Sequence, residues 1–399
     1  MRVDVPVWCL AIAETIVWAS LFYIFPALLP RFEAEFGWTK VELSGAFTLA
    51  IAMSAVTSPL AGKAIDRGAG PALLAGSALC GGILVGVLAL VGDLWAFYAV
   101  WAGLGVAMGG CLYEPCFAFV TRARGAGAKR SITLITLAAG FAGTVSFPTA
   151  HLIAEAGDWR RACAVVAAAV CAVAVPLMYA GARRLEATRA TSDPHGPAEH
   201  HRSAGPLLRR PAFWLLTGGF AAFALNHGIL LNHILPILHE RGLDAGAAVF
   251  AASAIGPMQV FGRLAMMATD RHISNKGVTL ACFAAVMIAA LLLLAAGTAP
   301  ALVVGFVVLQ GSGYGVTSIM RPVVAREIMG PANFGAVAGA LAVPYLAAVA
   351  AAPFIGSLLW QIGGYDLAIG AAFAAAGLGL VCYLQATAVA ARGRGPTGR

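Results

Sequence analysis

Charged residues are scarce in this chain of 399 residues, at 11% of the total. Soluble domains carry about 25%, so a globule of this size would lack the polar surface that water requires. The apolar set makes up 60% of the residues, which excludes an intrinsically disordered chain and a nucleic-acid-binding protein. The composition therefore predicts an integral membrane protein in contact with a lipid bilayer.

The chain also lacks the short motifs of several other classes. Its eight cysteines form no C-x-x-C pair and lie in apolar stretches, so we expect them to fill space, not to bind metal or form disulfides. No Walker loop occurs, which excludes ATP as the direct energy source. A membrane-embedded enzyme would need a cluster of nucleophile, base or metal ligands, and the sequence has no such cluster. We therefore expect neither a metal nor a cofactor.

Long apolar runs fill most of the sequence. A membrane-spanning helix needs about 20 mostly apolar residues, and breaks in hydrophobicity divide the chain into twelve such stretches. The fold class predicted is all-α and integral to the membrane, with twelve transmembrane helices. The stretches are residues 6–29, 41–61, 71–91, 94–120, 131–154, 160–181, 212–237, 246–268, 276–297, 299–322, 333–358 and 366–388.

Lys and Arg are distributed unevenly between the two sides that twelve spans define. Of the 26, 20 fall on the side that holds both termini and the central loop, five fall on the other side, and Arg263 lies within a span. Cytoplasmic loops carry an excess of Lys and Arg. Both termini are therefore predicted to be cytoplasmic.

A long polar stretch, residues 182–211, divides the spans six and six. It is rich in Arg, His, Pro and Gly, which is typical of a solvated linker more than of a histidine metal site. Residue types recur across it at an offset of 204–207 residues, which predicts two homologous six-helix bundles, residues 1–181 and 212–399, the second ending in a short basic cytoplasmic tail. The recurring residues are Trp8 with Trp214, Pro30 with Pro236, Asp66-Arg67 with Asp270-Arg271, Glu114-Pro115 with Arg321-Pro322, and Gly157 with Gly364.

The turn after the second predicted span carries a family signature. Its sequence from Gly62 to Gly70, Gly-Lys-Ala-Ile-Asp-Arg-Gly-Ala-Gly, resembles the G-x-x-x-D-R-x-G-R/K loop of the major facilitator superfamily and departs from it at Ala69 and Gly70. The resemblance implies two bundles related as parallel repeats, which work by alternating access. The residues that it assigns to conformational gating are Gly62, Asp66 and Arg67, with a degenerate copy at Asp270 and Arg271.

Other segments are similar to bacterial carriers related to monocarboxylate and oxalate transporters. They imply a multi-pass protein of the bacterial cytoplasmic (inner) membrane and an arginine, Arg263, that binds a substrate carboxylate. Gln259 stands where those carriers often have an acid, so a structural cation paired near Asp270 is the alternative for Arg263. The similar segments are Phe36-Gly37-Trp38-Thr39-Lys40-Val41-Glu42-Leu43, Tyr113-x-Pro115, His233-x-x-Pro236 and Gly262-Arg263-Leu264.

Only two of the 18 acids, Glu14 and Glu114, fall well inside predicted spans. An ionisable group in hydrocarbon costs about 2.5–3.5 kcal/mol or more, so each one indicates a function by default. We interpret both as candidate proton-coupling residues, the alternative being a fixed partner in an ion pair or a hydrogen bond. Because the repeat aligns Glu114 with Arg321, a second interpretation is an inter-domain latch between these two residues. Arg321 could instead bind an anionic substrate.

Polar and aromatic stripes mark three spans, the first, seventh and tenth, as candidate cavity walls. Residues 310, 314, 317 and 321 recur on one face of a helix, and polar stripes face a cavity more readily than lipid. In span 7, Asn226 and His233 are seven residues apart and are predicted to share a face, with His227 pointing elsewhere. The candidate substrate-binding residues are Trp18, Tyr23, Asn226, His233, Arg263, Gln310, Tyr314 and Arg321.

The sequence thus predicts a secondary active carrier that moves a small organic anion, such as a monocarboxylate, together with a proton. A proton-driven exporter or carrier of a larger amphipathic solute (a drug, vitamin or metabolite) is the alternative, and a channel or a solute sensor is a third. We expect a functional monomer whose partners are a small-molecule substrate, H⁺ and the lipid bilayer, and no nucleic acid.

Overall fold

The computed structural model describes residues 4–190, 209–269, 272–329 and 334–393. In this part of the chain all regular secondary structure is helical. A helix satisfies its peptide groups within its own segment, as hydrocarbon requires. The chain forms two compact units, residues 1–197 and 198–399, and each buries an apolar core of its own.

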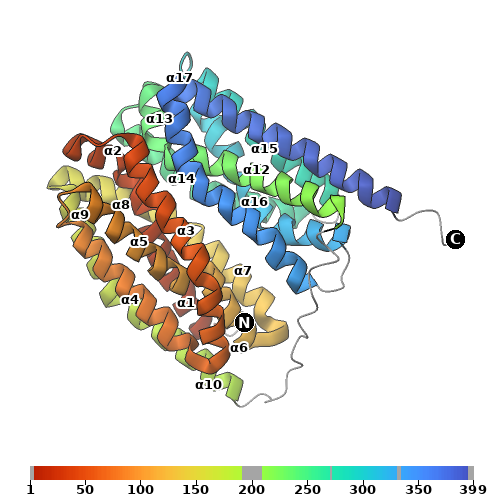
Figure 1. Cartoon of the computed structure of the whole chain (residues 1–399), viewed down its shortest axis with the longest axis horizontal. Coiled ribbons are helices and arrows are strands. Elements are labelled where there is room, and N and C mark those ends of the chain that lie inside the picture. Colours follow the sequence, from red (N-terminus) through yellow and green to blue (C-terminus); the bar gives the residue numbers. More distant parts are fainter. Residues whose placement is uncertain (1–3, 191–208, 270–271, 330–333, 394–399) are drawn as a thin grey trace. The chain divides into compact units, whose positions relative to one another are not determined.

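The first unit contains the helices drawn from red to yellow-green in Figure 1. Helix α5 packs against α3 and α4, and α1 packs against α7 and α10. The α-helices are α1 (Val5–Val17), α2 (Ile24–Phe36), α3 (Lys40–Ala64), α4 (Gly70–Leu88), α5 (Leu94–Cys111), α6 (Tyr113–Arg124), α7 (Ala128–Ala139), α8 (Ala142–Ala156), α9 (Trp159–Ala169) and α10 (Val175–Ala190). Short π-helical turns join several of them: η1 (Trp18–Phe22), η2 (Ile65–Ala69) and η4 (Val170–Ala174), with a 3₁₀ turn η3 (Gly125–Gly127).

The second unit is drawn from green to blue in Figure 1. Helix α16 packs against α14 and α15, and α12 packs along α17. Aromatic side chains such as Phe223 and Phe283, 5.0 Å apart between ring centroids, fill its core. The helices are α12 (Pro211–Asn232), α13 (Ile234–Glu240), α14 (Ala245–Thr269), α15 (Asn275–Ala295), α16 (Leu302–Met329) and α17 (Phe334–Gly393).

Ten stretches of helix in the described chain are long and apolar enough to cross a membrane. Two of them, Lys40–Leu88 and Ala340–Arg392, have 49 and 53 residues, about 70–80 Å of helix at 1.5 Å per residue, whereas the hydrocarbon core is about 30 Å thick. Each is interrupted by a glycine with a positive φ, Gly68 at 89° and Gly364 at 68°. Two crossings in each would give twelve, and that number stays a prediction.

The observed ends of two predicted regions differ from expectation. Helix α10 continues to Ala190, nine residues into the predicted linker, because residues 182–190 are mostly good helix formers: Ala, Arg, Leu and Glu. The rest of the predicted linker up to residue 208, Asp270 and Arg271 lie outside the described residues. The expected roles of Asp270 and Arg271 therefore stay predictions.

Two ion pairs occupy equivalent positions in the two units with their charges exchanged. Arg160 Nη1 lies 2.8 Å from Glu35 Oε1 in the first unit, and Arg241 is paired with Asp366 in the second. An offset of 206 residues relates Glu35 to Arg241 and Arg160 to Asp366. The repeat therefore relates contacts as well as residue types.

Glycines let helices approach closely inside each unit. A Cβ atom on Gly105 of α5 would overlap the backbone carbonyl of Ala50 in α3, and one on Gly311 of α16 would lie 2.7 Å from the carbonyl oxygen of Ile255 in α14. Gly311 follows Gly105 by 206 residues. The same close contact between two helices thus recurs at equivalent places.

Gly105→Ala should therefore destabilise the protein by about 1–3 kcal/mol, because a backbone neighbour cannot move aside as a side chain can. Thermal unfolding of the purified protein in detergent measures the effect. Gly76→Ala is the control, since a Cβ there meets nothing within 4 Å. Equal unfolding midpoints for the two variants would contradict the packing argument.

Candidate functional site

Glu14 lies in the last turn of helix α1 and is completely buried. Neither of its carboxyl oxygens has a hydrogen-bond partner among the described residues, and the same holds for the indole N–H of Trp18, one turn further along. The thiol of Cys116 and the indole of Trp18 nevertheless lie close enough to favour the charged form of Glu14, and the carboxyl group of Glu114 on α6 opposes it electrostatically. Glu14 is thus a buried acid that lies near a second acid, and no cation of the described part of the chain is among its neighbours.

A break between α5 and α6 brings Glu114 and Cys116 toward Glu14. Leu112 is extended, at φ −82° and ψ −162°, so the helix that begins at Tyr113 does not continue the face of α5. Cys116 is fully buried on α6, whereas Glu114 is exposed. The sequence predicts that Cys116 only fills apolar space, and only the tertiary contact with Glu14 distinguishes it from the other cysteines.

Aromatic rings from η1 and α6 lie beside Glu14 and Glu114. The ring of Trp18 lies 4.6 Å from that of Tyr113 and 5.1 Å from that of Phe22, between centroids. Tyr113 is in turn stacked on Phe117 at 4.8 Å. Tyr23, the neighbouring candidate, lies instead against Phe147 of α8, so Trp18 belongs to the Glu14 cluster and Tyr23 borders it.

The second unit contains a chain of polar side chains in contact, the polar line, which runs across α12, α16 and α17. Gln310 Nε2 lies 3.2 Å from Asn226 Oδ1 and 3.3 Å from His227 Nδ1. The imidazole of His227 is stacked on the ring of Tyr314, with centroids 3.3 Å apart and planes 8° apart. Tyr314 Oη is 3.2 Å from Tyr345 Oη on α17. The structure thus brings together Gln310, Tyr314 and Asn226 among the predicted residues.

Arg321 extends this line at the other end of the predicted stripe. Its guanidinium carbon lies 3.9 Å from the ring centroid of Tyr345, a distance at which a cation is attracted by an aromatic face. Nη1 of Arg321 is buried and has no hydrogen-bond partner in the described part of the chain. Tyr345 orients the guanidinium and leaves donor capacity for an added acceptor.

The two histidines of span 7 differ from the predicted arrangement in the position of His227, which contacts Gln310 together with Asn226. His227 faces α16 with Asn226, whereas His233 Nε2 lies 2.9 Å from the carbonyl oxygen of Pro353 on α17 and its ring packs near Tyr365. Asn226 also donates a 2.9 Å hydrogen bond to the carbonyl oxygen of Ala372 on α17, so Asn226 and His233 both contact α17. Helix α12 ends at Asn232, and His233 leaves the helical conformation, at φ −108° and ψ 15°.

Arg263 is buried on α14, and its Nε donates a 2.9 Å hydrogen bond to the carbonyl oxygen of Gly315 on α16. Gln259 contacts the same stretch, since a Cβ on Gly315 would overlap its backbone. Asp270, the alternative partner of Arg263, is outside the described residues. Both interpretations of Arg263 stay open.

The loop to which the sequence assigns gating turns at a glycine. Asp66 and Arg67 are exposed in η2, and Gly68 takes the positive φ of 89°. A side chain would be strained in this conformation, so Gly68 makes the turn one residue before the family's second glycine. The predicted latch partners Glu114 and Arg321 lie in different units, and their pairing stays a prediction.

Comparison with known protein families assigns the chain to one of them. The family model described as Major Facilitator Superfamily matches residues 10–343. The chain belongs to this superfamily. It is a membrane transporter of the secondary kind, not an enzyme. No curated protein matches the chain.

Solved structures share the fold of this superfamily member at low identity. A bacterial homologue of the human lysosomal transporter Spinster, inward-facing and occupied, superimposes with a TM-score of 0.65 at 14% identity, covering 97% of this chain and 96% of its own. The nucleoside transporter NupG gives a TM-score of 0.66 at 15% identity, covering 98% of this chain and 99% of its own. At these identities the likeness extends to the fold alone.

The contact between Arg321 and Tyr345 can be tested in the superfamily member itself. Tyr345→Leu should lower the free energy of unfolding by about 1 kcal/mol or more, since a cation on an aromatic face contributes about 0.5–2 kcal/mol. Tyr345→Phe keeps the face and loses only the hydroxyl, so it is the matched control. Thermal unfolding compares them, and equal midpoints for the two variants would show that the ring face does not hold Arg321.

Proposed function

We propose that this transporter couples the movement of a small organic anion, such as a monocarboxylate, to a proton in the same direction. The observation that carries the proposal is Glu14, a fully buried acid whose neighbours are Trp18, Cys116 and a second acid, Glu114. Support for the anion comes from Arg321, whose buried Nη1 has donor capacity left. Glu14 suits the proposed proton, and Arg321 suits the proposed organic anion.

The buried environment of Glu14 suits a group that takes up and releases a proton. Burial favours the neutral form of a carboxyl group, and so does a second carboxyl group nearby. Water that reaches Glu14 in one conformation and not in another would change its protonation. A proton carried with a monoanion also cancels the charge that must cross the low-dielectric core.

Arg321 suits a carboxylate ligand because a guanidinium presents several N–H donors in a planar fork. Tyr345 covers one face of the guanidinium, which leaves its edge for an acceptor. Arg263 is the second candidate for this role, with Nε engaged by Gly315. Gln310, Tyr314, Asn226 and His233 complete the proposed substrate residues of this unit.

The alternative function is the export or transport of a larger amphipathic solute. The rings of Trp18, Phe22, Tyr113 and Phe117 form a continuous aromatic surface beside Glu14, which favours a flat solute. NupG, one of the similar structures, is named as a nucleoside transporter. We propose the bacterial inner membrane as the location, with both termini cytoplasmic and a monomer as the working form.

Uptake into proteoliposomes tests the substrate class. With an inward proton gradient imposed, a panel of radiolabelled monocarboxylates, dicarboxylates, nucleosides and amphipathic compounds is offered to the purified protein. We expect accumulation of at least one carboxylate that collapses when the gradient is dissipated. Accumulation of a neutral solute alone would favour the alternative function and overturn the anion assignment.

Glu14→Gln separates proton coupling from substrate binding. The amide stays neutral at all pH values, so exchange of substrate for substrate should continue while gradient-driven accumulation falls to the level of empty vesicles. Counterflow and gradient-driven uptake measure the two activities side by side. Glu155→Gln is the control, because Glu155 is an exposed partner of Arg31. Loss of both activities in Glu14→Gln would assign Glu14 a structural or binding role.

A further inference from the structure

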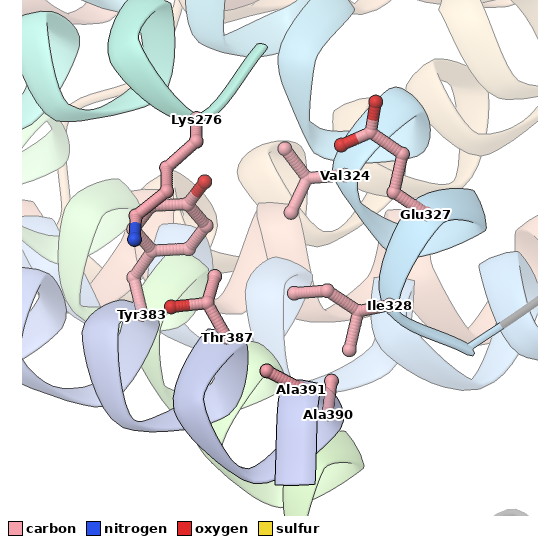
Figure 2. A pocket seen from close by; sticks show the side chains of 8 residues that line it. All are labelled: Lys276, Val324, Glu327, Ile328, Tyr383, Thr387, Ala390 and Ala391. Carbon is pink, nitrogen blue, oxygen red and sulfur yellow. The ribbon is translucent and has the colours of Figure 1, made fainter. Parts of the chain in front are cut away.

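A cavity lies between three helix ends of the second unit, apart from the polar line that contains Arg321. It has a volume of about 180 Å³, far more than the roughly 15 Å³ that one water needs. Helices α15, α16 and α17 all contribute to its wall, as Figure 2 shows. The lining residues are Lys276, Val324, Glu327, Ile328, Tyr383, Thr387, Ala390 and Ala391.

The cavity sits at one end of the bundle, where water and hydrocarbon meet. Lys276 is the second residue of α15, Glu327 is two residues before the end of α16, and Ala391 is two residues before the end of α17. These three helices belong to stretches that are long and apolar enough to cross a membrane. The distribution of Lys and Arg predicts that this end is cytoplasmic.

Opposite charges line opposite walls of this cavity. Figure 2 shows Lys276 on the same side as Tyr383 and Thr387, and the carboxylate of Glu327 on the other side, with Val324 and Ile328 between. Asn275 donates a hydrogen bond to Glu327 Oε1, which fixes the position of the carboxylate. A ligand that fits both walls must carry an anionic and a cationic group.

The hydroxyl group of Thr387 does not replace Lys276 as a donor to the anionic group of a ligand. Thr387 already donates to the carbonyl oxygen of Leu384, at 2.7 Å, in its own helix. Lys276 is exposed, and its ammonium group has three donors on a flexible stem. Lys276 and Glu327 are therefore the two residues whose removal should separate the two charges of a ligand.

We propose that this cavity binds the head group of a zwitterionic phospholipid with a primary ammonium group, phosphatidylethanolamine, from the adjacent leaflet. The phosphate would contact Lys276 and the ammonium would donate to Glu327. Ala390, Ala391, Val324 and Ile328 offer apolar surface to the glycerol and the first acyl carbons. A purely anionic head group meets repulsion from Glu327, and a quaternary ammonium head group has no N–H to donate to it.

The test measures thermal unfolding of the full-length protein in detergent during titration with short-chain lipids. Dioctanoyl phosphatidylethanolamine should raise the midpoint by about 2 °C at about ten times its Kd. Dioctanoyl phosphatidylcholine and dioctanoyl phosphatidylglycerol should raise it by less than half as much. Equal shifts with all three lipids would overturn the proposal, since any lipid would then suffice.

Variants locate the effect. Lys276→Ala and Glu327→Gln should each remove the preference for phosphatidylethanolamine and keep the midpoint measured without lipid. Arg326→Ala is the matched control, because it removes an exposed charge next to Glu327 on the same helix and should keep the preference. An unchanged preference in both cavity variants would place the lipid elsewhere and overturn the assignment.

Two further titrations distinguish a phospholipid from a soluble zwitterion and from an anionic lipid. Glycerophosphoethanolamine, which has the head group and no acyl chains, should give no shift at the same concentration, and an equal shift would indicate a soluble zwitterion and overturn the lipid proposal. If phosphatidylglycerol stabilises best and only Lys276→Ala abolishes its effect, the site is one for anionic lipid and the role given to Glu327 is wrong.

Discussion

Hydrocarbon offers no hydrogen-bond partner to a polar group, and this constraint shapes each unit of the transporter. Peptide groups satisfy one another within helices throughout the described chain. Most charged residues lie near helix ends, where ion pairs such as Glu35 with Arg160 are partly exposed. Against this background the few ionisable groups that remain inside, Glu14 above all, are costly and therefore informative.

The buried polar groups of the two units differ in chemistry. The first unit presents an acid, Glu14, beside aromatic rings and a thiol. The second presents amides, an imidazole and a guanidinium arranged along α16, from Gln310 to Arg321. A repeat that keeps its packing contacts, such as Gly105 and Gly311, has thus diverged in its polar side chains, which supports the proposed transport of an anion with a proton.

Much of this arrangement follows from sequence patterns of short range. Hydrophobic runs locate the helices, and the spacing of Gln310, Tyr314 and Arg321 places them on one face because α16 is a continuous helix. The burial of Glu14 also follows from its place in an apolar run.

Other features depend on backbone breaks and tertiary contacts that no spacing shows. His227 contacts Gln310 of α16 although its spacing predicts another face, and His233 leaves the helical conformation where α12 ends at Asn232. The partners Cys116 and Tyr345 come from α6 and α17 and carry no motif of their own. The zwitterionic cavity likewise combines Lys276 and Glu327 from two helices, which only the folded unit brings together.

The central claim is that Glu14 carries a proton with each anion. The most direct measurement follows internal pH with a trapped fluorescent dye while a radiolabelled carboxylate enters proteoliposomes clamped at zero membrane potential. One proton should enter with each monoanion in the wild-type protein, and none should enter through Glu14→Gln during exchange. Anion entry without acidification in the wild type, or unchanged acidification with Glu14→Gln, would contradict the account.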